Sequence, residues 1–382
     1  MAGQRLHSMD ALRASTMLLL VPAHAAILLS VNGHGGAWSS AVLWVIHVFR
    51  LPLFFAMGGL FGVLLARRDG LARATRNRLL RVGLPLAVGV ITLVPIYGAL
   101  ANATGVAITA DGNPAYVLPL APSYLWFLWY LAILYAAAGL CSALAPRLTR
   151  RFGTALGAAL RRSPGVLAAV LGTAAVLWPN PEWQTPPPAG FTPDLPILGY
   201  YAIFFCFGCA LATNRGLPRA MERNGWRWFG AAAIVAVPAA LLYSLHNEGG
   251  SGAPTALHAA ALLLLAAATW TSLFALIGLA RRYLSARPHP GIRYIADSSY
   301  WIYLTHLQVM VLVMAVLLKT TLPTVALFGL IVSITCAVTL AMYAALVRYS
   351  FIGWVLHGPR RRPTPAPLGS LTRPAAAASP PA

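Results

Sequence analysis

Residues 10–31 read DALRASTMLLLVPAHAAILLSV, an apolar run long enough to cross a membrane as a helix. Arg13 and His24 interrupt it, eleven residues apart. Eleven residues make about three helical turns, so both side chains share one face, with about 16 Å of rise between them. Because charge is costly in hydrocarbon, ionisable residues inside such a run are candidates for function. We expect Arg13 near one membrane surface and His24 near the middle.

The composition indicates an all-α polytopic integral membrane protein. Of 382 residues, 59% are hydrophobic and 9% charged, and the mean hydropathy is +0.70. Repeated apolar runs of about 20 residues predict helices, and they lack the alternation of a membrane β-barrel. We predict ten spans, at about 10–31, 38–65, 81–100, 124–145, 164–178, 195–213, 228–245, 256–280, 297–318 and 324–347.

The net charge of +20 follows the loops between these spans. Arginines gather after every second span, whereas the intervening loops hold Asp111, Glu182, Asp194 and Glu248 and no arginine. This positive-inside pattern predicts a multi-pass inner (plasma) membrane protein with both termini in the cytoplasm. It also explains the basic charge without nucleic acid as a partner.

We expect one membrane domain, residues 1–357, followed by a disordered, cytoplasmic Pro/Ala-rich tail, 358–382. The run 10–31 has features of a signal peptide, but Arg13 and its apolar continuation to Val31 favour a retained span. The cysteines all lie in predicted spans, where packing is the expected role, and neither a metal site nor a disulfide framework is evident.

The first span offers the clearest candidate chemistry. Asp10 and Arg13 are three residues apart and can pair. Pro22 removes a backbone donor just before His24 and can open the helix locally. A neutral imidazole there can act as a general base, whereas the structural alternative is a histidine that hydrogen-bonds between helices. For Arg13 the alternative is a side chain that snorkels to the surface.

The second span carries His47 and Arg50 in its outer half. Arg50 lies too far from the cytoplasmic end to snorkel there, so it either reaches outward or faces a polar cavity. Gly58 and Gly59 follow and allow close contact with another helix.

Two further positions complete the candidates. Arg78 and Arg81, three residues apart at the cytoplasmic mouth of the third span, can clamp phosphate. His306 lies within the ninth span and is either a structural hydrogen-bonding residue or a contact for substrate.

Together these stretches resemble the acyltransferase type 3 family, within it the glucans biosynthesis protein C group, whose members add succinyl groups to periplasmic glucans. The resemblance rests on Asp10…Arg13…Pro22-Ala-His24, Ile46-His47…Phe49-Arg50…Phe54-Phe55, Arg81-Val-Gly-Leu-Pro85, Leu125-Trp126-Phe127-Leu128 and Ser299-Tyr300…Ile302-Tyr303-Leu…His306. The sequence departs from the family at Gly58-Gly59, where Ser-Gly is usual. It also lacks the carboxyl-terminal hydrolase-like domain of some relatives, so we expect transfer to be completed within the membrane domain.

The resemblance implies a membrane O-acyltransferase that moves an acetyl or succinyl group from cytoplasmic acyl-CoA to an extracytoplasmic glycan or another hydroxyl acceptor. No permanently bound cofactor is expected. Arg78, Arg81 and Arg13 would hold the coenzyme phosphates, and His24 would serve as base. Arg50 would stabilise the oxyanion or pair with an acyl carboxylate. His47, His306 and Asp10 are candidate substrate contacts.

Two other function classes use the same residues. An anionic solute transporter or flippase would use the buried Arg and His side chains as a pathway, but the sequence lacks the repeated halves typical of transporters. A non-catalytic assembly subunit would use them only to hold helices together.

Overall fold

The computed structural model describes residues 7–109, 121–180, 188, 190–249, 255–285 and 290–357, with side chains of 243–249 left out. The predicted tail, 358–382, lies outside the described residues. The regular elements of the described ranges are all helical. The α-helices are α1 His7–Leu18, α2 Leu20–Leu29, α3 Ala37–Asp69, α4 Leu71–Ile91, α5 Leu93–Thr104, α6 Trp126–Leu144, α7 Pro146–Ala159, α8 Ser163–Leu177, α9 Leu195–Thr213, α10 Gly216–Arg223, α11 Gly225–Gly249, α12 Thr255–Leu284, α13 Pro290–Leu317, α14 Thr324–Met342 and α15 Phe351–His357.

Within the described ranges, nine helical stretches are long and apolar enough to cross a membrane, or ten if one bent pair counts as a span. This confirms the polytopic all-α prediction. The bent pair is α7 and α8, which meet at 112°. It corresponds to the short fifth span predicted at 164–178, and α7 is an additional helix that hydropathy alone did not indicate, because its apolar residues alternate with arginines.

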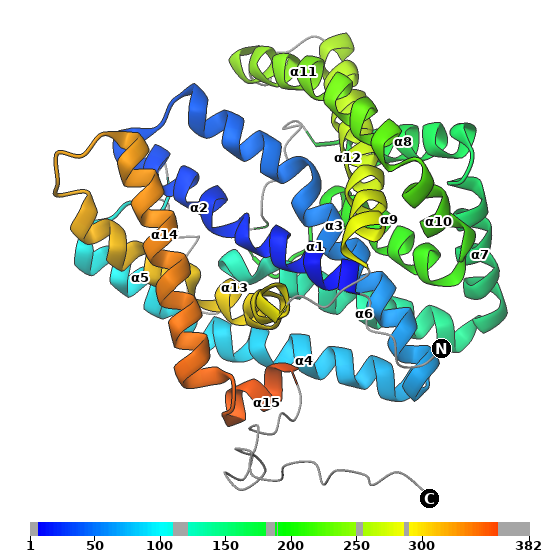
Figure 1. Ribbon diagram of the computed structural model, residues 1–382, viewed down its shortest axis with the longest axis horizontal. Coiled ribbons are helices and arrows are strands. Elements are labelled where there is room, and N and C mark those ends of the chain that lie inside the picture. Colours follow the sequence, from blue (N-terminus) through cyan, green and yellow to red (C-terminus); the bar gives the residue numbers. More distant parts are fainter. Residues whose placement is uncertain are drawn as a thin grey trace, which may run out of the picture.

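Many of the side chains that face outward are large and apolar, as expected for helices in contact with lipid. Large exposed hydrophobic residues occur on α8, α11 and α14, including Leu167, Ile234 and Val325, the last 84% exposed. Figure 1 shows α1 and α13 in the middle of the helical assembly and α7, α8 and α10 grouped at one edge.

Two glycines bring α3 and α9 into direct backbone contact. A Cβ added to Gly208 would lie 1.8 Å from the carbonyl oxygen of Ala56, and one added to Gly59 would lie 2.0 Å from that of Phe205. Only glycine allows helix backbones to approach this closely. The close-contact interpretation of Gly59 is therefore confirmed, and α3, which carries His47 and Arg50, is fixed against α9.

Helix α13 is the other central element. It packs against α1, α5 and α14, and its middle, from Ile302 to Val311, is continuously buried. The polar side chains of this buried stretch, Thr305, His306 and Gln308, therefore face protein instead of lipid.

The four cysteines, at 141, 206, 209 and 336, are free thiols.

Candidate active site

The first span is broken in its middle. Helix α1 ends at Leu18 and α2 begins at Leu20, with Leu19 in a turn. Pro22 has no N–H group, so the carbonyl of Leu18 loses its usual helical partner. The Arg50 guanidinium from α3 reaches this break, where its Nη1 donates to the Leu19 carbonyl at 3.5 Å. The predicted opening of the helix near Pro22 therefore faces a buried cation.

Arg13 connects α1 to the start of α13. Its Nε donates to Ser299 Oγ at 3.1 Å, and its Nη2 donates to the carbonyl of Ala296. Ser299 Oγ also donates to the Ala296 carbonyl. The half-buried guanidinium is thus directed between helices. Asp10, also half-buried, lies three residues earlier on α1, and its role as a substrate contact stays a prediction.

His24 lies beside His306, two turns further along α13 than Ser299. The ring centroids are 4.8 Å apart, and the rings meet edge to face at 71°. Arg13 and His24 therefore both face α13, as their eleven-residue spacing predicted. His24 is half-buried, whereas His306 is fully buried.

Hydrogen bonds define the tautomers of both histidines. Nδ1 of His24 lies 3.0 Å from the Leu20 carbonyl, and Nδ1 of His306 lies 3.1 and 2.9 Å from the carbonyls of Ile302 and Tyr303. A carbonyl oxygen only accepts, so Nδ1 carries the hydrogen in each ring and Nε2 carries a lone pair. The site thus contains two neighbouring imidazoles whose Nε2 atoms can accept a proton.

A network of hydrogen bonds joins Tyr124 to the residues of α13 on either side of His306. Tyr303 Oη donates to the Tyr124 carbonyl at 2.9 Å, and Tyr124 Oη donates to the Leu304 carbonyl at 3.0 Å. Gln308 Nε2 donates to Tyr124 Oη at 2.6 Å and to the Leu93 carbonyl at 2.9 Å. Sequence reasoning missed Tyr124 and Gln308. An amide two residues from a histidine inside an apolar span was the available signal for Gln308.

Arg50 and His47 extend the cluster on α3. Arg50 is 2% exposed, and none of the carboxylates in the described residues lies within ion-pair distance of it. Arg50 donates to the Leu19 carbonyl and His24 to the adjacent Leu20 carbonyl, so the guanidinium and this imidazole meet at the break of the first span. His47 is half-buried, with Nδ1 2.9 Å from the Leu43 carbonyl.

Several buried polar atoms in and near this cluster have no protein partner in the described part of the chain. They include a donor, Nε of Arg50, and two acceptors, Nε2 of His306 and Oε1 of Gln308. Ser123 Oγ is also unpaired, and Ser123 adopts a φ of +44°, which is unusual for a residue other than glycine. Buried polar groups are normally satisfied, so these atoms indicate where a polar ligand would bind.

The phosphate-clamp candidates lie on α4. Arg78 stacks over Tyr135, with Cζ 5.9 Å from the ring centroid, and its Nη2 lies 3.4 Å from the Phe61 carbonyl. Arg81 is half-buried and close enough to Arg78 for the two charges to repel. Its backbone carbonyl accepts from Tyr300 Oη at 2.9 Å. Tyr300 follows Ser299, the partner of Arg13, so one turn of α13 contacts both α1 and α4 beside these arginines.

The described site therefore has two levels along α13. Ser299 and Tyr300 mark an arginine level, and Tyr303 and His306 mark a histidine level that includes His24 and Arg50. His306 lies seven positions after Ser299, which corresponds to about 10 Å of helical rise. Within the described ranges no group of three or more His, Cys, Asp or Glu side chains is arranged to hold a metal ion.

A buried cluster of histidines and an arginine inside a multi-pass helical bundle defines a membrane protein with a polar site in its interior. Comparison with known families identifies which class it is. The family described as "Acyltransferase domain" matches residues 6–342, and the chain belongs to this acyltransferase type 3 family of membrane acyltransferases. Membership supports the acyltransferase hypothesis over the transporter hypothesis.

Curated relatives are similar over a shorter segment. The chain is 31% identical over 149 residues to "Glucans biosynthesis protein C" of Escherichia coli strain K12. This alignment covers 36% of this chain and 38% of the relative. The protein of the same name from Escherichia coli strain SMS-3-5 matches to the same extent. The similarity thus spans well under half of either protein. No solved structure matches the chain.

Proposed function

We propose that this protein is a membrane O-acyltransferase that moves an acyl group from cytoplasmic acyl-CoA to a hydroxyl of an extracytoplasmic glycan or another cell-envelope acceptor. The observation that carries the proposal is the contact between His24 and His306, two imidazoles with Nε2 lone pairs, together with the buried Arg50 guanidinium at the Leu19 carbonyl, next to the carbonyl that His24 contacts. Acyl transfer needs a base for the hydroxyl and a positive group for the oxyanion, and these three side chains supply both.

The donor would lie along α13. Coenzyme A has its phosphates at one end and its thioester at the end of a long flexible arm. In this proposal Arg78, Arg81 and Arg13 bind the phosphates, because guanidinium groups bind phosphate oxygens in pairs. The arm then extends from the level of Ser299 toward the level of His306.

The reaction would proceed by direct transfer. Nε2 of His24 takes the proton of the acceptor hydroxyl as its oxygen attacks the thioester carbonyl carbon. The tetrahedral oxyanion lies against Arg50, whose Nε has no protein partner. When the intermediate collapses, the carbon–sulfur bond breaks and the coenzyme A thiolate takes the proton from His24. His306 accepts a hydrogen bond from the acceptor through its unpaired Nε2.

The acyl group would be acetyl or succinyl in type. Arg50 can pair with the distal carboxylate of a succinyl group in place of the oxyanion, since none of the described carboxylates pairs with it. A glucan acceptor is supported by the similarity to "Glucans biosynthesis protein C" of Escherichia coli. His47 and Asp10 would contribute further contacts to substrate.

The decisive experiment replaces the proposed base. Cells that produce wild-type protein, His24→Ala or the control His34→Ala would be compared by mass spectrometry of envelope glycans. His34 lies at the end of the first span, outside the site. We expect acyl groups with wild type and with His34→Ala but not with His24→Ala, although all three proteins elute as folded species in detergent. Wild-type acylation by His24→Ala would refute the assignment of the base.

A further inference from the structure

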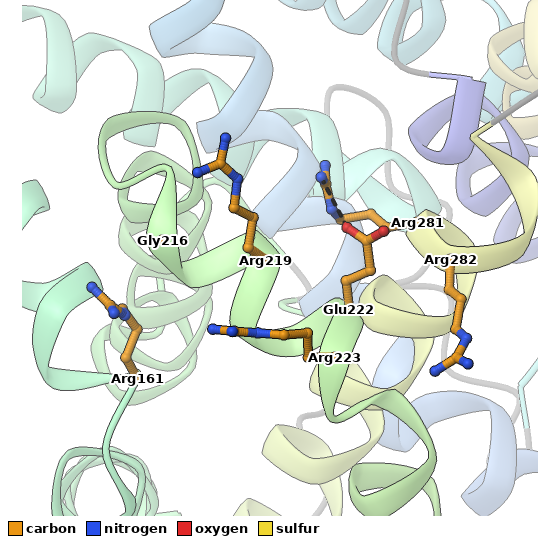
Figure 2. Close-up of a pocket in the computed structure, with 7 residues that line it drawn as sticks. All are labelled: Arg161, Gly216, Arg219, Glu222, Arg223, Arg281 and Arg282. Atoms are coloured by element: carbon orange, nitrogen blue, oxygen red, sulfur yellow. Dashed lines mark hydrogen bonds and ion pairs between the residues drawn. The ribbon is translucent and has the colours of Figure 1, made fainter.

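A pocket lined mainly by arginines lies at the edge of the helical assembly, between the α7–α8 turn, α10 and the end of α12. Its volume is about 690 Å³, and its charged lining consists of Arg161, Arg219, Glu222, Arg223, Arg281 and Arg282. Figure 2 shows these side chains around α10, with Arg223 directed toward Arg161. None of them belongs to the two levels along α13.

The pocket carries more positive charge than its protein partners neutralise. Five arginines face one carboxylate, so the lining has a net charge of +4. Among the described residues its one salt bridge joins Arg281 Nη2 to Glu222 Oε2 at 3.2 Å, and Nε of Arg281 is buried without a partner. Like charges held this close repel each other, so the arrangement favours a bound anion.

Arg161 lies against the turn that begins α10. A Cβ on Gly216, at the start of α10, would lie 2.8 Å from Nη1 of Arg161. The guanidinium of Arg161 therefore lies directly against the Gly216 backbone at the start of α10. Asn214 holds this turn in place, because its Oδ1 accepts from the backbone N–H groups of Gly216 and Leu217.

Neighbouring aromatic residues place the pocket at a membrane surface. Trp226 Nε1 donates to Tyr283 Oη at 2.9 Å, and these side chains are 56% and 57% exposed. Exposed tryptophan and tyrosine are typical of the boundary between hydrocarbon and water. Arg282, a lining residue, stacks on Tyr283 with Cζ 5.6 Å from the ring centroid. The pocket therefore lies at the depth of lipid headgroups.

Helix α7 also indicates that the pocket lies at the depth of the lipid headgroups. It turns by 112° from α8 and exposes Leu148 and Phe152 to 67% and 56%, while Arg150 and Arg151 on the same short helix are also exposed. A helix with exposed apolar and basic residues is typical of one that lies in the plane of the membrane surface. Its end leads directly to Arg161.

From these contacts we infer that the pocket binds a phosphate-bearing anion, and that this anion is the headgroup of an anionic phospholipid. A guanidinium group can bind two phosphate oxygens at once through parallel hydrogen bonds. Basic pockets between membrane helices on the cytoplasmic side are suited to lipid headgroups. Phe229, which contacts Trp226 edge to face, and Leu284, which follows Tyr283, are 50% and 40% exposed and offer an apolar surface for acyl chains. The inference does not depend on acyl transfer.

The test compares two variants of equal charge. Arg219→Gln/Arg223→Gln removes two lining residues, and Arg73→Gln/Arg76→Gln removes two exposed arginines of α4 that lie outside the pocket. Each full-length protein, confirmed as folded by gel filtration, would be titrated with phosphatidylglycerol in detergent and analysed by native mass spectrometry. We expect roughly tenfold weaker lipid retention in the pocket variant and at most twofold in the control. Equal retention in both variants would overturn the site.

Two further measurements separate the sources of phosphate. Inorganic pyrophosphate should not displace phosphatidylglycerol at equal concentration, because it lacks acyl chains; full displacement would overturn the assignment to lipid. Glu222→Gln removes the one carboxylate that the described residues contribute to the lining, so it should increase lipid retention. Weaker retention in that variant would contradict the electrostatic explanation, even if the double arginine variant failed to fold.

Discussion

Replacing Gly208 by alanine should separate α3 from α9. The added Cβ would lie 1.8 Å from the Ala56 carbonyl oxygen and 2.9 Å from the backbone nitrogen of Leu60. Ordinary contact begins at 3.4 Å, so the closer approach is about 1.6 Å too short. The obstructing atoms belong to the backbone, and no side-chain rotation can relieve the overlap.

The expected cost is at least about 3 kcal/mol of unfolding free energy, the upper end of the range for overpacked interiors. Because α3 carries Arg50, the displacement should also weaken the contact of its guanidinium with the Leu19 carbonyl, which is already long at 3.5 Å. We therefore expect a loss of acyl transfer together with the loss of stability.

The assay is thermal unfolding in detergent, followed by intrinsic fluorescence, with wild type, Gly208→Ala and Gly329→Ala. Gly329 lies in α14, where an added Cβ would meet no atom within 4 Å. This control should unfold at the wild-type temperature or slightly above it, because alanine favours helix. If Gly208→Ala unfolded at the wild-type temperature and retained transfer, the direct backbone contact between α3 and α9 would be refuted.

Three other predictions concern the site. Arg78→Lys and Arg81→Lys should each weaken acyl-CoA binding by roughly tenfold, because lysine lacks the guanidinium fork; unchanged affinity in both, measured by calorimetry, would exclude them from the donor site. Arg50→Gln should reduce succinyl transfer far more than acetyl transfer if Arg50 pairs with the acyl carboxylate, and both equally if it stabilises the oxyanion, whereas full activity with both donors would leave it a structural role. His306→Ala should lower kcat by about 100-fold, as expected for loss of a catalytic hydrogen bond, without changing acyl-CoA affinity; an unchanged kcat would exclude a substrate contact.

Periodicity alone predicted several features that the structure contains. The spacing of Arg13 and His24 placed them on one face because a helix repeats every 3.6 residues, and both contact α13. Gly59 was interpreted as a close helix contact and forms one.

Other features depend on contacts between distant segments, which hydropathy does not encode. Arg13 and Ser299 are 286 residues apart, and no local pattern pairs His24 with His306. Helix α4 begins at Leu71, ten residues before the predicted third span. Its first part is rich in arginine, which is a good helix former but is too polar to be counted in an apolar run. The helices α7 and α10 were missed for the same reason, since a search for apolar runs passes over amphipathic and basic helices.

Because one helix carries both levels of the site, its length and phase fix how the two levels are aligned. A residue inserted between Ser299 and His306 would move the histidine by 1.5 Å along α13 and turn it by about 100° around the axis. His306 would then face away from His24, although every side chain would still be present. A substitution in this segment leaves the register of the two levels unchanged, whereas an insertion or deletion shifts it. The number of residues between Ser299 and His306 is therefore as much a part of the site as the side chains themselves.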